Sequence, residues 1–181
     1  DTDRTLGHRG LSAFLVEKPG TDEHEFCFEQ ESGGCLTGRS IPTIGYRGMH
    51  SYDLVFEDYF VPEANLIGGA EGQGRGFYLA MAGLTGGRIQ TAARASGVMR
   101  AALKAAVRYS QDRKVFGAHL GDYQLTQAKL ARMAALVAVS RCFAYSVGAL
   151  LDSGEGQMEA SLVKLFACRS AEWITREALQ I

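Results

Sequence analysis

The sequence predicts an α+β protein in which a β-rich first part, residues 1–70, precedes an up-down bundle of long helices, residues 71–181. Three observations predict this class. Large apolar side chains alternate with polar ones around residues 52–57, as in a half-buried strand. An apolar stripe with steps of three and four then runs from residue 77 to residue 106, as on one face of a helix. Two further amphipathic segments follow, with a glycine stop between them.

The β-rich part contains three short candidate strands. Residues 11–17 form an apolar run that ends at the turn signal of residues 18–20, and residues 26–28 begin a second strand. Residues 52–57 have the period-two pattern of a strand with one face more buried than the other. Pro62 cannot donate a hydrogen bond to a sheet, so the chain leaves the sheet there and the domain boundary falls near residue 70.

One charged residue, Arg88, interrupts the apolar stripe of the first long helix, which we expect at about residues 74–111. The stripe consists of Phe77, Met81, Leu84, Arg88, Ala92, Ala95, Met99, Ala102 and Ala106. A guanidinium on such a face needs a partner, which is an acid on a neighbouring helix, solvent reached by the long side chain, or a ligand phosphate. The preceding Gly86 and Gly87 each cost about 1 kcal/mol relative to alanine. Close helix packing and close approach of a ligand explain these glycines equally well.

Two more helices complete the predicted bundle. The second covers about residues 121–152 and stops at Gly154, and the third begins near Gln157. The third helix continues to Ile181 without a stop signal. Because an antiparallel bundle usually has a fourth helix, we expect the chain to be a fragment with its last helices missing.

Composition and charge disfavour several classes of protein. The formal net charge of −1 argues against a nucleic-acid partner and gives no reason to invoke an anionic membrane surface. We find no uninterrupted apolar run long enough to span a bilayer, and residues 1–4 do not resemble a secretory signal, so we expect a cytoplasmic protein. The cysteines and histidines lack the spacing of metal ligands, so we expect no metal site and reduced thiols. The four cysteines are Cys27, Cys35, Cys142 and Cys168.

A cluster at the end of the first long helix carries a resemblance to a known family. Arg113, Phe116-Gly117 and Gln124 stand at the spacing found in the carboxy-terminal helical domain of acyl-CoA dehydrogenases. Residues 10–16 and 54–68 resemble strands and the end of that family's middle β-barrel domain, and residues 71–74 resemble the opening of its helical domain. A closer similarity is to methylsuccinyl-CoA dehydrogenases, carried by residues 45–49, 68–74 and 88–95.

The resemblance implies an FAD-dependent enzyme that forms a 2-enoyl-CoA from an acyl-CoA and passes electrons to an electron-transfer flavoprotein. It implies that Arg113 reaches the FAD diphosphate of a neighbouring subunit in a dimer or tetramer, where a planar guanidinium suits phosphate oxygens. Phe116 would pack on the adenosine part, while Gln124 and Gln180 would hydrogen-bond the same cofactor. The alternatives for these residues are an ion pair of Arg113 with Asp112, a core phenylalanine and solvated glutamines.

The residues that would contact the substrate match the family pattern only in part, and the catalytic base is not expected among residues 1–181. Thr85 and Arg88 match positions that line the acyl-CoA pocket in the family, although an acidic residue is usual in place of Thr85. The catalytic glutamate is expected beyond Ile181, and the alternative position used by some branches is Gly87 here, which cannot act as a base. We therefore expect the 181-residue chain to be inactive alone.

Two other functions are compatible with parts of this pattern. A flavin oxidase or monooxygenase on the same fold would release peroxide or use oxygen instead of passing electrons to a carrier flavoprotein. A non-catalytic helical-bundle interaction protein would bind no flavin. A bundle has no packing need for Arg113, Phe116, Gln124 and Gln180 together, which disfavours that last alternative.

Overall fold

The computed structural model describes residues 3–45 and 48–181 and divides the chain into two compact units. The first unit ends at Ala80 and the second runs from Met81 to Ile181. This division lies inside a helix, ten residues after the domain boundary expected at residue 70. The expected domain boundary itself stays a prediction.

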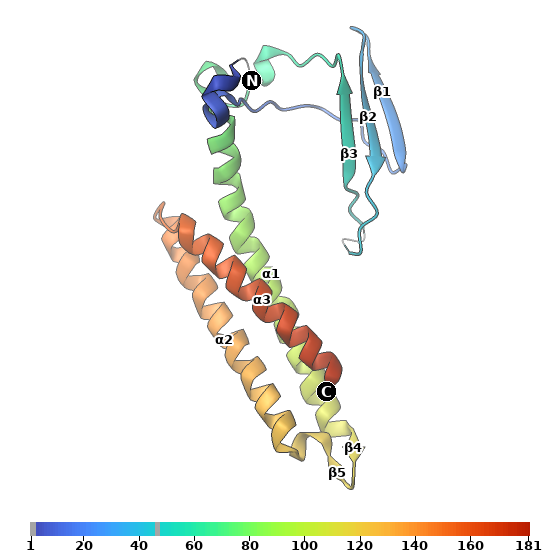
Figure 1. The fold of residues 1–181 in the computed structure, drawn as a ribbon, viewed down its shortest axis with the longest axis vertical. Helices are drawn as coiled ribbons and strands as arrows, with labels where there is room; N and C mark the ends of the chain where they lie inside the picture. Colours follow the sequence, from blue (N-terminus) through green and yellow to red (C-terminus); the bar gives the residue numbers. More distant parts are fainter. Residues whose placement is uncertain (1–2, 46–47) are drawn as a thin grey trace. The chain divides into compact units, whose positions relative to one another are not determined.

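The first unit contains a three-stranded antiparallel sheet (Figure 1). Its strands are β1 (Glu25–Gln30), β2 (Gly34–Ser40) and β3 (Tyr52–Glu57), in the order β1-β2-β3. The predicted strand over residues 11–17 is wrong, because Phe14 forms only an isolated bridge with Leu66. Ala13 and Leu15 on either side of Phe14 bond to Ile67 and to Asn65, which ends a 3-10 turn (Glu63–Asn65), so the pairing stays a single bridge.

The two faces of this sheet differ in polarity. On one face Phe26 lies in register with Gly38 and its ring occupies the space a side chain at Gly38 would need. The same ring packs edge-on against Tyr52, with 5.4 Å between ring centroids. Because side chains alternate along each strand, the opposite face carries most of the polar groups. That face consists of Glu25, Cys27, Glu29, Cys35, Thr37, Arg39, Asp53, Val55 and Glu57.

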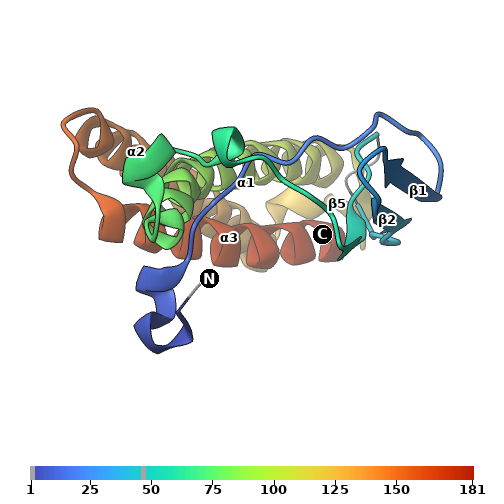
Figure 2. The same ribbon diagram turned by 90° about the horizontal axis from the view of Figure 1, so that it is seen from above.

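Three long helices follow: α1 (Gly76–Asp112), α2 (Gln124–Asp152) and α3 (Gln157–Gln180). They confirm the predicted helical bundle. The later turns of α1 lie beside α2 and α3 (Figure 1 and Figure 2). A short hairpin of β4 (Lys114–Val115) and β5 (Ala118–His119) and a 3-10 turn (Leu120–Asp122) join α1 to α2.

The bundle core consists of two apolar clusters along the helices. The buried residues of the first are Ala92, Ala95, Val147, Ala160, Val163 and Ala167, and those of the second are Met99, Ala106, Met133, Val137 and Ile174. The predicted stripe on α1 is therefore buried in its later turns. Leu84 remains 50% exposed, because the contacts of α1 with the clusters begin only at Ile89.

Helix α2 is the most apolar of the long helices, although charged residues interrupt it. It is long and apolar enough to cross a membrane by length and composition, with a mean hydropathy of 1.7 over an 18-residue window. Only 17% of that window is buried. One such helix is weak evidence for a membrane span, since core helices of soluble proteins have the same length and composition.

Candidate functional site

Arg113 stands where α1 ends and the hairpin begins. Its backbone N–H donates to the carbonyl of Tyr109 at 2.9 Å, and its carbonyl accepts from the N–H of Leu120 at 2.8 Å, so the main chain is held on both sides. Its exposed side chain makes no hydrogen bond or ion pair with the residues described here. Asp112 pairs instead with Arg108, at 3.8 Å between carboxylate and guanidinium. The helix-end pair that would have occupied Arg113 is absent from the described part of the chain.

Phe116 occupies the tip of the hairpin in an unfavourable conformation. Val115 and Ala118 pair directly, so Phe116 and Gly117 form a two-residue loop, and their φ angles of 48° and 86° are both positive. Glycine adopts this conformation freely, but a phenylalanine there is strained by of order 1 kcal/mol or more. The ring gains no packing in return, since Phe116 is 99% exposed. The alternative of a core phenylalanine is therefore wrong.

The start of α2 lies against this hairpin. The hydroxyl of Tyr123 donates to the carbonyl of Val115 at 2.7 Å, and the carboxylate of Asp122 accepts from the N–H of His119 at 3.0 Å. Among the described residues no side chain caps the first turn of α2, so its first N–H groups lack helical partners, and the side chain of Gln124 beside them is exposed.

Gln180 comes to the same part of the bundle from the last turn of α3. Its side-chain oxygen accepts a hydrogen bond from the ammonium group of Lys129, on the second turn of α2. Lys129 also pairs with Glu177 at 2.8 Å, and both of these side chains are about one fifth exposed. With its oxygen engaged, the amide of Gln180 keeps its NH₂ group free to donate.

This donor set fits a diphosphate-containing cofactor such as FAD. The end of the bundle offers a guanidinium with no partner among the described residues, the first N–H groups of a helix and an amide NH₂, all of which can donate hydrogen bonds to phosphate oxygens. The exposed ring of Phe116 adds a flat apolar surface of the kind on which a base stacks. These groups stand on a projecting surface, so a ligand held by them needs a second surface to enclose it.

The residues predicted to meet the substrate lie farther back on α1. Arg88 is half-buried, and its guanidinium forms no hydrogen bond or ion pair within residues 3–45 and 48–181. A side-chain carbon at Gly86 or Gly87 would meet nothing within 4 Å, so close helix packing within the described chain does not explain these glycines. Thr85 is buried and donates its hydroxyl to the carbonyl of Met81 at 3.1 Å, so its contact with a substrate stays a prediction.

Two residues of this region escaped sequence reasoning. Tyr123 fixes the hairpin and Lys129 holds Gln180. The ion pair of Lys129 joins positions 48 residues apart in sequence, so no local pattern indicates it.

Comparisons with known proteins agree on one family. The family model for the acyl-CoA dehydrogenase C-terminal domain matches residues 74–181. The chain is 41% identical over 179 residues to a (2S)-methylsuccinyl-CoA dehydrogenase of Cereibacter sphaeroides, covering 98% of this chain and 31% of that protein.

Solved structures give the same result. The butyryl-CoA dehydrogenase of Megasphaera elsdenii matches with a TM-score of 0.81 and 34% identity, over 99% of this chain and 43% of that one. A chain from the structure described as the electron transferring flavoprotein of Acidaminococcus fermentans also has a TM-score of 0.81 and 34% identity, over 98% of this chain and 43% of that one. The chain thus spans between about a third and two fifths of the length of these relatives.

Proposed function

The chain belongs to the acyl-CoA dehydrogenase family, and we propose that it is part of an FAD-dependent enzyme that oxidises an acyl-CoA to the 2-enoyl-CoA. The observation that carries the proposal is the end of the bundle, where an unpaired Arg113 and a strained, exposed Phe116 stand together. Neither residue contributes to packing there, so both are explained by something that covers them. FAD, when bound, accepts the hydride from the substrate's β-carbon.

The chain's own residues hold the cofactor in this proposal. Arg113 forms charge-assisted hydrogen bonds with the diphosphate, and Phe116 packs against the adenosine part. Gln124 and the NH₂ group of Gln180 donate neutral hydrogen bonds, with Lys129 keeping the Gln180 amide oriented. Because these groups project from the bundle, the flavin they contact is the one bound to a neighbouring subunit of a homo-oligomer.

The open part of α1 takes the substrate. A side-chain carbon at Gly86 or Gly87 would meet no other described segment within 4 Å, which leaves room for an acyl-CoA to lie against the backbone. Arg88 follows these glycines with a charge that no described residue pairs, and this charge can meet a carboxylate or a phosphate of the ligand. The similarity to a (2S)-methylsuccinyl-CoA dehydrogenase supports a substrate with a second carboxylate.

The base that removes the α-proton belongs to a part of the protein beyond Ile181. A carboxylate for this task must lie against the thioester in a site from which water is excluded. Gly87, the alternative position in α1, has no side chain. We therefore expect no acyl-CoA turnover by the 181-residue chain alone.

The visible absorption spectrum of the full-length protein tests this function. We expect a flavin spectrum that methylsuccinyl-CoA bleaches more completely than butyryl-CoA, with reoxidation by an electron-transfer flavoprotein. Rapid reoxidation by oxygen with release of peroxide would instead identify an oxidase. A protein without flavin, even after incubation with FAD, would contradict the proposal.

A further inference from the structure

Two cysteines lie together on the polar face of the first unit's sheet. Cys27 on β1 is paired with Thr37, and Cys35 on β2 is paired with Glu29. Thr37 and Cys35 are two residues apart on β2, so Cys35 lies on the same face as Cys27, one same-face position further along the strand pair. Cys27 and Cys35 are therefore diagonal neighbours across the two strands. Both are free thiols.

A carboxylate lies beside this pair. Cys35 is in register with Glu57 on β3, and its thiol donates to a carboxylate oxygen of Glu57 at 3.8 Å. Desolvation, then the neighbouring Cys27 and Glu57, raise the pKa of the Cys35 thiol. The carboxylate of Glu57 thus already contacts the Cys35 thiol as a hydrogen-bond acceptor.

The two thiols differ in access. Cys27 is exposed and Cys35 is half-buried. Cys27 also lines an open hollow of about 560 Å³ on this face, together with Thr37 and Arg39. A small oxidant in solution thus reaches Cys27 first.

We propose that Cys27 and Cys35 form a redox modification site, in which hydrogen peroxide oxidises Cys27 and Cys35 then closes a reversible disulfide. This site lies outside the groups assigned to flavin and substrate. Cys27 takes the role of the oxidised thiol, Cys35 that of the resolving thiol, and Glu57 that of the proton acceptor.

The chemistry balances in two steps. In the first, the sulfur of Cys27 attacks one oxygen of the peroxide and the O–O bond breaks. The leaving hydroxide takes the Cys27 proton, so a sulfenic acid and water form. In the second, the sulfur of Cys35 attacks the sulfenic sulfur while Glu57 takes the Cys35 proton. The S–S bond forms, the S–O bond breaks, and the leaving hydroxide receives that proton as water. Two thiols and one peroxide thus give one disulfide and two waters.

The strand geometry favours an easily reduced bond. Diagonal neighbours in an antiparallel pair have Cα atoms about 7–8 Å apart, slightly beyond the spacing of a relaxed disulfide. Closing the bridge must draw β1 and β2 together, and a strained disulfide is reduced more readily than a relaxed one. This property suits a reversible modification better than a structural crosslink.

Peptide mass mapping of the full-length, flavin-loaded protein after limited peroxide treatment tests the proposal. We expect the loss of two hydrogens on the linked peptides of Cys27 and Cys35, reversed by dithiothreitol, while Cys142 on α2 stays a free thiol. In Cys35→Ser, Cys27 should instead accumulate as a sulfenic acid that dimedone traps. Glu57→Gln should slow the second step and raise the trapped fraction severalfold.

Several results would overturn the assignment. Cys27 and Cys35 both remaining free at peroxide levels that modify Cys142 would remove the site. A sulfinic acid on Cys27 with Cys35 still reduced would show that the second thiol does not resolve the first. An unchanged rate of disulfide formation in Glu57→Gln would contradict proton transfer to that carboxylate.

Discussion

Phe116 has an unfavourable conformation in the chain alone, which its proposed contact with the cofactor would explain. Its positive φ is unfavourable for a phenylalanine, and its ring is 99% exposed, so the isolated chain gains nothing from it. The sequence indicated Phe116 only through its family spacing. Its strain was not predictable, because it depends on the two-residue hairpin that Tyr123 holds from the next helix.

Phe116→Gly should therefore separate stability from cofactor binding. Glycine relieves the backbone strain at the tip, so we expect the flavin-free protein to be unchanged in stability or more stable by about 1 kcal/mol. Flavin affinity should fall, because the stacking surface is lost. Urea unfolding and flavin titration measure the two effects. A loss of stability in the flavin-free protein would contradict this account.

Helix α1 was predictable from the sequence in its length and buried face, but not in its surroundings. Periodicity predicted its length and its buried later turns, which lie in the two core clusters. It could not show that the space around Gly86 and Gly87 is empty within the described chain, since that depends on where α2 and α3 lie. The strand predicted at residues 11–17 failed for a related reason, because an apolar run does not reveal whether a partner strand exists.

Gly87→Ala should stabilise α1 and impair the enzyme. Alanine favours a helix by about 1 kcal/mol over glycine, and no described atom within 4 Å opposes a side chain at Gly87. We expect a higher free energy of unfolding for the 181-residue chain and a lower kcat/KM for the full-length enzyme. Gly83→Ala is the matched control, because Gly83 has the same open surroundings on the same helix. Equal kinetic effects of the two changes would remove Gly87 from the substrate site.

The ion pair between Lys129 on α2 and Glu177 on α3 can be tested for its contribution to the stability of the bundle. Lys129 and Glu177 are mostly buried, so Glu177→Ala leaves an ammonium group short of a partner and should cost about 1–3 kcal/mol in urea unfolding. Glu172→Ala on the same helix should cost under about 0.5 kcal/mol, since its pair with Arg176 is exposed. Equal costs would show that the ion pair of Lys129 does not hold the helices together.

At the scale of the whole molecule, the chain leaves apolar surface uncovered. Helix α2 is strongly apolar yet mostly exposed, and Leu125 and Tyr145 are 74% and 72% exposed. The chain spans less than half of its relatives, which agrees with further protein covering this surface. The family and the bundle could be predicted from the spacing of a few residues. The enclosure of the site could not, because it depends on surfaces that this chain does not supply.

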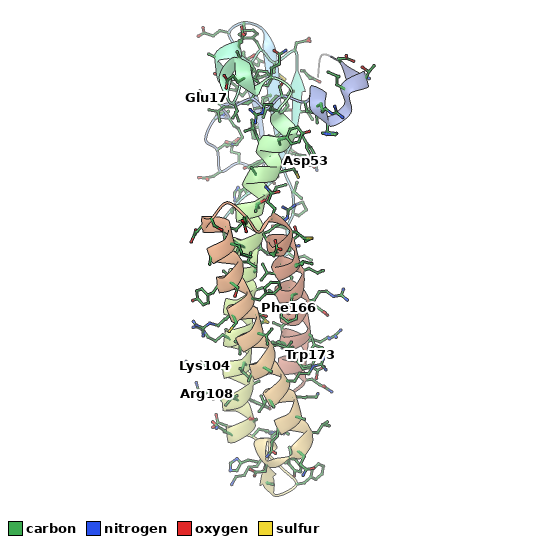
Figure 3. All side chains as sticks on the ribbon, turned by 90° about the vertical axis from the view of Figure 1, so that its left-hand side faces the viewer. Glu17, Asp53, Lys104, Arg108, Phe166 and Trp173 are labelled. Atoms are coloured by element: carbon green, nitrogen blue, oxygen red, sulfur yellow. The ribbon has the colours of Figure 1, made fainter. Side chains whose placement is uncertain are left out.

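The most direct test of the account is the flavin affinity of the full-length protein with Arg113→Ala beside Arg108→Ala. The two arginines lie five residues apart at the end of α1, and Arg108 is labelled near Lys104 in Figure 3. The exposed side chain of Arg108 pairs with Asp112. Losing a hydrogen bond to a charged group costs about 1.5–3 kcal/mol, so we predict that Arg113→Ala weakens FAD binding roughly 10- to 100-fold. Arg108→Ala should leave it unchanged. Equal affinity in both variants and the unaltered protein would contradict the assignment of this end of the bundle to the cofactor.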